Sequence, residues 1–334
     1  MLFATISTKA TVWTVSNDAN QPAQFSNLQI ACDSASAGDT LYVQGTPTDY
    51  GSVSIKKQLH IIGAGIKPSG NFLYGYPTAI STIILDTVSY ISGASGTIIE
   101  GVTNNSTLTT YTGCKNIILK RNKFAGSYRK FNSCTNILIY NNIFTAGYLR
   151  LSSATNIIIM NNIFSSSYIE NGGTTISISN NVFLNSIAFS SCNSSTISNN
   201  IFYYAAVTST DYCSFSNNIG FGIATNIVQG TNTGSGNLTS DPKFTYIYST
   251  TDHSFNDNNK YSTQTTSPAN NAGTDATDIG IYGGQYPWPE SNIAAYMHLI
   301  SPTMPVVQEL NIQNSSVPAN GTLNFSVKAI KTAK

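Results

Sequence analysis

An all-β fold, a parallel β-helix solenoid, is predicted by the spacing and the composition of one repeated phrase. The phrase occurs six times between residues 121 and 220, for example as NNIF at 141–144. A repeat period near 20 residues is typical of a solenoid. The residues before each Asn pair, such as NILIY at 136–140, are β-branched and partly alternate in polarity, which indicates strands. Each repeat is therefore one coil of strands and turns, stacked about 4.8 Å from its neighbours.

The first ten residues, MLFATISTKA, come before the predicted solenoid. They end in short side chains, as a signal-peptide cleavage region does, but their apolar part is short and no basic segment precedes it. Residues 1–10 are therefore either the remnant of a signal peptide or the first strand. Composition also favours a secreted, extracellular or cell-surface protein, because only 9% of the residues are charged and Ser, Thr, Asn and Tyr must solvate the surface.

Two stretches at the ends of the repeat region carry a family resemblance. Residues 28–65 include AGDT and IGAG, and residues 241–284 include DPKF, SPANNAG and DIGIYGG. They resemble the opening and the closing coils of right-handed β-helix proteins of the pectate lyase-like superfamily, of the secreted bacterial type. The resemblance implies a short N-terminal capping helix and a right-handed solenoid of about ten coils over residues 11–284. It leaves the chemistry open, because the superfamily holds lyases, hydrolases, adhesins and fibre proteins.

The second Asn of each phrase forms a column with steps of 20, 20, 19, 19 and 18 residues. Asn tolerates the left-handed backbone of a sharp turn, and stacked amides can hydrogen-bond from coil to coil. We therefore predict a structural ladder in preference to a set of sugar or calcium ligands. Its members are Asn122, Asn142, Asn162, Asn181, Asn200 and Asn218. The Phe residues two positions later are likewise interpreted as core stacking.

Acidic residues are scarce where the resemblance implies catalysis. Polygalacturonases of this fold use clustered Asp residues, and pectate lyases use acidic calcium ligands with an Arg or Lys base. Between residues 101 and 240 this chain has only Glu170 and Asp211. Glu100 and Arg121, one coil apart, are the remaining candidate catalytic pair. The sequence therefore favours a non-enzymatic protein; the alternative is a polysaccharide lyase or glycoside hydrolase that acts on acidic polysaccharide.

A row of aromatic residues is the candidate glycan-binding surface. Tyr128, Tyr148 and Tyr168 each lie four residues after a Phe, and Lys130, Arg150 and Glu170 follow two residues later. Alternation along a strand places these side chains outward, whereas Arg129 falls on an inward position. The exposed rings and the cations Lys130 and Arg150 suit an acidic polysaccharide. The alternative is cross-strand packing that stabilises the solenoid face.

The C-terminal residues do not continue the pattern of the repeats. Residues 285–304 contain PWPE and SPTMP and are predicted to be a linker. Residues 305–334 contain two short alternating stretches, which predict a pair of strands that is marginal alone. This segment either caps the last coil or pairs with another chain, so self-association is an expected property.

Charge and cysteine content limit the remaining partners. A net charge of +1 gives no drive toward nucleic acid, and no apolar run is long enough to span a membrane. The five Cys residues lack a CxxC motif and the three His residues are scattered, so we predict no metal site and no cofactor. Cys114 and Cys134 lie one coil apart, which brings them within disulfide range. We therefore expect a non-enzymatic surface, matrix or fibre-forming protein that contacts glycans.

Overall fold

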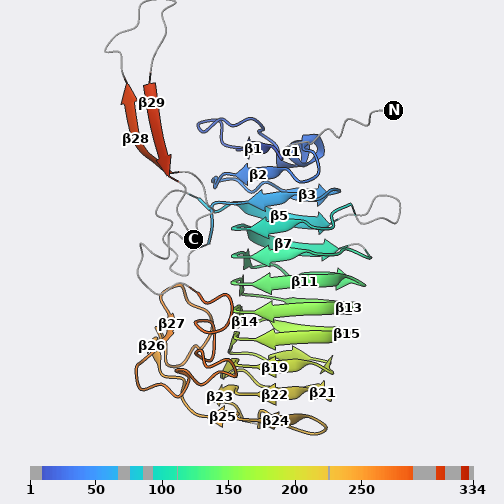
Figure 1. The fold of residues 1–334 in the computed structure, drawn as a ribbon, viewed down its shortest axis with the longest axis vertical. Helices are drawn as coiled ribbons and strands as arrows, with labels where there is room; N and C mark the ends of the chain where they lie inside the picture. The colour runs from blue at the N-terminus through green and yellow to red at the C-terminus, as the bar shows by residue number, and fades with distance from the viewer. Residues whose placement is uncertain are drawn as a thin grey trace, which may run out of the picture.

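The computed structural model describes residues 10–66, 76–85, 93–110, 112–224, 226–288, 306–312 and 325–330. These residues form a parallel β-solenoid of about 9 turns and contain a single short helix. The coils stack along one axis, with β1 near one end and β24 and β25 at the other (Figure 1). The predicted all-β solenoid is therefore confirmed. We refer to its three sides as faces A, B and C.

Face A contains the strands that precede the Asn pairs, all paired in parallel from coil to coil. Inward Ile and Leu side chains of this face, such as Leu119, Ile139 and Ile159, are fully buried in the central core. Its strands are β1 (Val12–Val15), β2 (Thr40–Val43), β4 (His60–Ile62), β6 (Ile98–Glu100), β8 (Ile118–Lys120), β11 (Thr135–Tyr140), the second parts of β13 (Tyr148–Met160) and β15 (Tyr168–Ser179), β19 (Thr196–Ser198), β22 (Ser214–Ser216) and β24 (Thr233–Ser235).

Faces B and C complete each coil. Face B contains β3 (Ser52–Ile55), β5 (Ala79–Leu85), β7 (Thr103–Thr110), β10 (Tyr128–Asn132), the first parts of β13 and β15, and β17 (Phe189–Ser190). Face C contains the starts of β5 and β7, then β9 (Lys123–Phe124), β12 (Ile143–Phe144), β14 (Ile163–Ser165), β16 (Val182–Leu184), β20 (Ile201–Tyr203), β23 (Ile219–Phe221) and β25 (Leu238–Thr239). A separate parallel pair, β18 (Cys192–Asn193) with β21 (Thr210–Asp211), flanks the later coils.

The sharp turn between faces A and C depends on residues that accept a left-handed backbone. The first residue of each Asn pair has a positive φ, for example 52° at Asn141 and 53° at Asn161. Asn occupies this region more readily than most residues. In the earliest phrase the position is held by Arg121, whose φ is 56°. The two residues of each Asn pair therefore have different roles, since the first forms the turn and the second enters the core.

A helix covers the N-terminal end of the cylinder, as predicted. Helix α1 (Leu28–Ser34) begins after Asn27, whose side chain accepts a hydrogen bond from the Ile30 backbone N–H at 3.0 Å. The helix buries Leu28, Ala31 and Cys32 against the first coil. Removing these apolar side chains from water makes the cap adhere to the open end.

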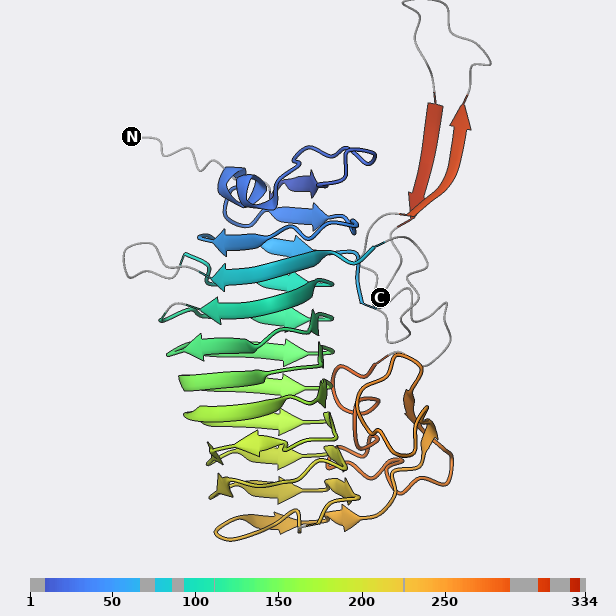
Figure 2. The same cartoon turned by 180° about the vertical axis from the view of Figure 1, so that it is seen from behind.

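Residues 241–284 do not add closing coils to the stack, in contrast to the expectation from the family resemblance. The last parallel pairing joins β23 to β25, and β26 (Phe244–Tyr246) pairs antiparallel with β27 (Lys260–Thr263). The chain then returns along face C (Figure 2). Apolar side chains that point outward from face C, such as Ile163 and Ile201, join Phe244 and Trp288 in a second hydrophobic core. In each Ile-Phe dipeptide the Phe points into the central core and the apolar Ile points outward. Without the returning segment, these Ile side chains would form an exposed apolar surface.

The C-terminal strand pair is present, as predicted. Strands β28 (Val306–Ile312) and β29 (Phe325–Ile330) pair antiparallel. In both views the pair lies near the end of the molecule that carries β1, far from β24 and β25 (Figures 1 and 2). Residues 1–9 and the predicted linker from residue 289 onward lie outside the described residues.

All five Cys residues are buried, and no disulfide joins Cys114 to Cys134. Within the described ranges, no helix combines the length and apolarity needed to cross a bilayer.

Candidate functional site

The second Asn of each phrase belongs to a buried hydrogen-bonded ladder. Asn142 donates from its backbone N–H and from Nδ2 to Oδ1 of Asn162, at 2.9 and 3.0 Å. Its Nδ2 also reaches the carbonyl of Leu119 at 2.9 Å. The same pattern repeats down the column, and the six Asn side chains named from the sequence are fully buried. Asn237, 19 residues beyond Asn218, accepts the last pair of bonds and was missed because no second Asn precedes it.

The first Asn of each pair holds the returning C-terminal segment against the solenoid. Asn217 donates to the carbonyl of Ala272 at 2.8 Å, Asn161 donates to that of Gly283 at 2.7 Å, and Asn141 donates to that of Tyr286 at 2.9 Å. The order is antiparallel, because coils earlier in the chain bind later residues of the segment. These side chains satisfy backbone carbonyls that the packing would otherwise leave without donors.

Phe rings stack along the inside of the coils next to the Asn ladder. The centroids of Phe144 and Phe164 are 4.5 Å apart, and the rings are nearly parallel at 3°. Arg129 extends into this core and is fully buried. Its guanidinium lies 5.0 Å from the Phe124 centroid and donates from Nη1 to the carbonyl of Ala146 at 2.7 Å. Its Nε and Nη2 have no hydrogen-bond partner among the described residues, so the inward register costs free energy.

The candidate catalytic residues Glu100 and Arg121 are brought together on face A. Arg121 Nη1 lies 2.9 Å from Glu100 Oε1, and Lys120 Nζ lies 2.8 Å from Oε2. His60 on the preceding coil is 3.4 Å from the same Oε2. The Glu100 side chain is only 5% exposed. The sequence did not indicate His60 or Lys120 as partners.

These contacts define the chemistry that Glu100 can perform. Burial alone would raise the pKa of Glu100, but the hydrogen bond to His60 and the charge of Lys120 outweigh it, with a further contribution from Arg121, and lower the pKa to about 2. The carboxylate is therefore ionised at neutral pH and is a weak base engaged by its neighbours. This arrangement suits an ion-pair network between coils better than proton transfer to a substrate.

The aromatic candidate surface forms a stack on the outside of face B. The centroids of Tyr128 and Tyr148 are 6.0 Å apart, and those of Tyr148 and Tyr168 are 5.6 Å apart. Each ring is half-buried. Because the rings lie against one another, their edges and hydroxyls face solvent more fully than their inner faces. We call these three Tyr residues, with Lys130 and Arg150, the Tyr strip.

The charged residues of the Tyr strip lie over its rings. Lys130 Nζ is 4.0 Å from the Tyr128 centroid, and the Arg150 guanidinium is 5.0 Å from that of Tyr148. Arg150 also pairs with Glu170 at 2.9 Å. Cations over aromatic faces gain cation–π energy, about 0.5 to 1 kcal/mol where exposed. The strip therefore combines hydroxyl donors with one unpaired ammonium group, that of Lys130, among the described residues.

Neither a metal-binding cluster among the described residues nor a match to a known protein indicates a role for these surfaces. Within the described part of the chain, no group of three His, Cys, Asp or Glu residues is placed to hold a metal ion. No protein-family model and no curated protein matches the chain.

Proposed function

We propose that this chain is a non-enzymatic structural protein of the cell exterior, a rigid solenoid that contacts an acidic polysaccharide through the Tyr strip. The observation that carries the proposal is the continuity of its columns. The Asn ladder, the Phe stack and the Tyr strip each connect successive coils in register. Such columns connect each coil to its neighbours along the long axis, which suits a rigid rod.

The polar character of the surface supports an extracellular setting. Only 9% of the residues are charged, so hydroxyl and amide groups carry most of the hydration. The ion-pair network around Glu100 supports the non-enzymatic assignment over a lyase or hydrolase, because both residues of the candidate pair are committed to each other. Lys130 and the edges of the Tyr rings supply the groups that an acidic glycan would bind.

Replacing Tyr128, Tyr148 and Tyr168 together by Ser tests the Tyr strip. On a column of immobilised pectate or alginate, we expect retention of the parent and a loss of affinity of about tenfold or more for the triple variant. The parent should release no unsaturated product or reducing ends from these polymers. Because the three half-buried side chains lie on the outside of face B, we expect the triple variant to remain folded, which a thermal melt verifies.

The matched control replaces two Tyr residues outside the strip, Tyr212 and Tyr248, which are 73% and 60% exposed. The control variant should be retained like the parent. Equal retention of the strip variant and the parent would contradict the glycan contact. Turnover that disappears in Glu100→Gln would instead favour the enzyme.

The C-terminal strand pair is the proposed point of self-association. Among the described strands, β28 and β29 pair only with each other, so the outer edge of each has no partner strand there. Unpaired edges recruit further strands. We expect deletion of residues 305–334 to abolish oligomers of the full-length protein in sedimentation and electron microscopy, while the unfolding midpoint stays unchanged. A lower midpoint would identify the pair as an intrachain cap, and unchanged assembly would exclude a docking role.

A further inference from the structure

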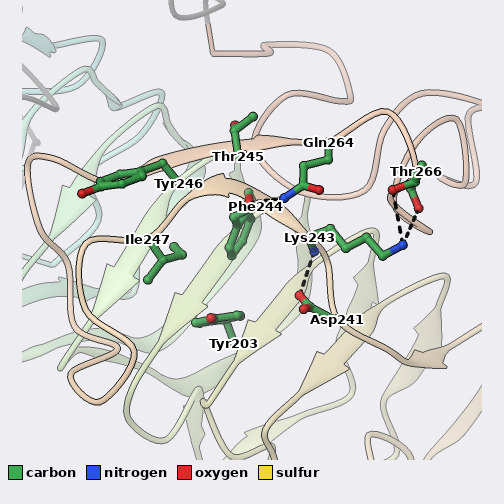
Figure 3. A pocket seen from close by; sticks show the side chains of 9 residues that line it. All are labelled: Tyr203, Asp241, Lys243, Phe244, Thr245, Tyr246, Ile247, Gln264 and Thr266. Carbon is green, nitrogen blue, oxygen red and sulfur yellow. Dashed lines mark hydrogen bonds between the residues drawn. The ribbon is translucent and has the colours of Figure 1, made fainter.

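A pocket of about 500 Å³ lies between face C and the first part of the returning segment. Tyr203 of β20 contributes to its lining from the solenoid, and the rest comes from β26 with the residues on either side of it and from residues just after β27 (Figure 3). Its volume falls within the range of small-molecule sites, about 300 to 1,000 Å³. It is separate from the Tyr strip, which lies on face B, and from the Glu100 network on face A.

The apolar part of the pocket is formed by side chains that contact neighbouring aromatic rings. The Tyr203 centroid lies 5.2 Å from that of Phe244 and 5.6 Å from that of Phe221. Figure 3 shows Tyr203, Phe244 and Ile247 directed toward a common space. Tyr246 stands at the rim and is 49% exposed. Aromatic and aliphatic carbon on one side of a pocket suits the C–H face of a flat, partly apolar ring.

The polar side chains of the pocket are held in place by hydrogen bonds, most of them to backbone groups of the pocket residues. Asp241 Oδ1 accepts the Lys243 backbone N–H at 2.8 Å, and Gln264 Nε2 donates to the Phe244 carbonyl at 3.2 Å. Lys243 Nζ donates to the carbonyl and hydroxyl oxygens of Thr266 at 3.1 and 3.3 Å. Within the described part of the chain, Asp241 Oδ2 and Gln264 Oε1 are left as acceptors, and the ammonium group keeps one further N–H.

We propose that this pocket binds one residue of a neutral saccharide. The C–H face of the sugar packs against Tyr203 and Phe244, and neighbouring hydroxyls donate to Asp241 and Gln264. One carboxylate and one ammonium group cancel in charge, so the pocket has no electrostatic preference for an anion or a cation. The division into an apolar side and an acceptor-rich side matches the two kinds of surface on a pyranose ring.

Ligand-observed NMR and calorimetry on the full-length protein test the pocket. The probes are the methyl glycosides of glucose, galactose, mannose, xylose and N-acetylglucosamine, with galacturonate and glucosamine as charged comparisons. We expect saturable binding of at least one neutral probe, with Kd on the order of 1 mM, and weaker binding of both charged probes. No saturable binding of any neutral probe, or tighter binding of a charged one, would overturn the proposal.

Two variants locate the binding. Asp241→Asn keeps Oδ1 for the Lys243 N–H but replaces the free acceptor with a donor, so we expect a loss of affinity of about tenfold. Asp275→Asn is the matched control, because Asp275 is an exposed carboxylate that also bonds its own loop, at Thr277. It should bind like the parent. Equal affinity of Asp241→Asn and the parent would refute the site, and the triple Tyr-strip variant should bind these probes normally.

Discussion

Asn162→Ala is expected to lower the free energy of unfolding by about 1 to 3 kcal/mol. Asn162 Oδ1 accepts both the backbone N–H and Nδ2 of Asn142, and its own Nδ2 bonds the carbonyls of Ile139 and Met160. Removing the amide leaves the buried backbone N–H of Asn142 without an acceptor, whereas Asn142 Nδ2 keeps the carbonyls of Leu119 and Tyr140. Urea denaturation followed by circular dichroism measures the change.

A second Asn column at the surface provides the control for this prediction. Asn136 donates to Asn116 Oδ1 at 3.0 Å, but the residue is exposed and has a φ of 58°. Asn136→Gly keeps the left-handed backbone accessible and should change the stability by less than about 0.5 kcal/mol. Equal effects of the two substitutions would show that burial of the ladder contributes nothing to the free energy of unfolding.

Arg129→Met is expected to stabilise the protein by about 1 to 3 kcal/mol. The register places Arg129 between Leu108 and Leu149, in an otherwise apolar inward column. Its contacts with Phe124 and the Ala146 carbonyl offset only part of the desolvation, which costs several kcal/mol for a buried ion. Met fills much of the same volume without a charge. A lower urea midpoint for the variant would show that the guanidinium contributes net stability.

Arg129 also predicts the direction in which the stability of the protein changes with pH. Burial lowers the pKa of Arg129 from its usual value to about 9. Between these values the unfolded chain binds one more proton than the folded chain, so the stability of the parent rises with pH there, by about 1.4 kcal/mol per pH unit. The gap between Arg129→Met and the parent in free energy of unfolding should therefore be largest near pH 8 and smaller by about 1.4 kcal/mol near pH 10. A constant gap would show that Arg129 stays protonated throughout.

The sequence was sufficient to predict the repeating part of the fold because each coil reuses one pattern. A 20-residue step predicts that Glu100 lies near Arg121 and that the Tyr residues stack, and both groups are neighbours in the structure. The inward position of Arg129 followed from strand alternation alone. Local periodicity therefore carries most of the information about what lies one coil away.

The parts that could not be predicted depend on contacts without a period. His60 pairs with Glu100 across one coil although 40 residues separate them, which is twice the repeat length. The returning segment binds Asn141 and Asn161 from 120 to 145 residues away. The pocket combines Tyr203 with residues that follow the last coil. No short pattern in the sequence marks such partners, so only the folded structure brings them together.

The returning segment also constrains how the chain can fold during synthesis. Coils of a solenoid can pair as soon as each one is made, because each contacts only its neighbours. The outward Ile side chains of face C, however, are fully covered only when residues 244–288 have been translated. A ribosome-bound intermediate would therefore display an apolar stripe along otherwise finished coils, a surface that chaperones bind and that promotes aggregation. The last residues of the described body thus decide whether the earlier ones remain soluble.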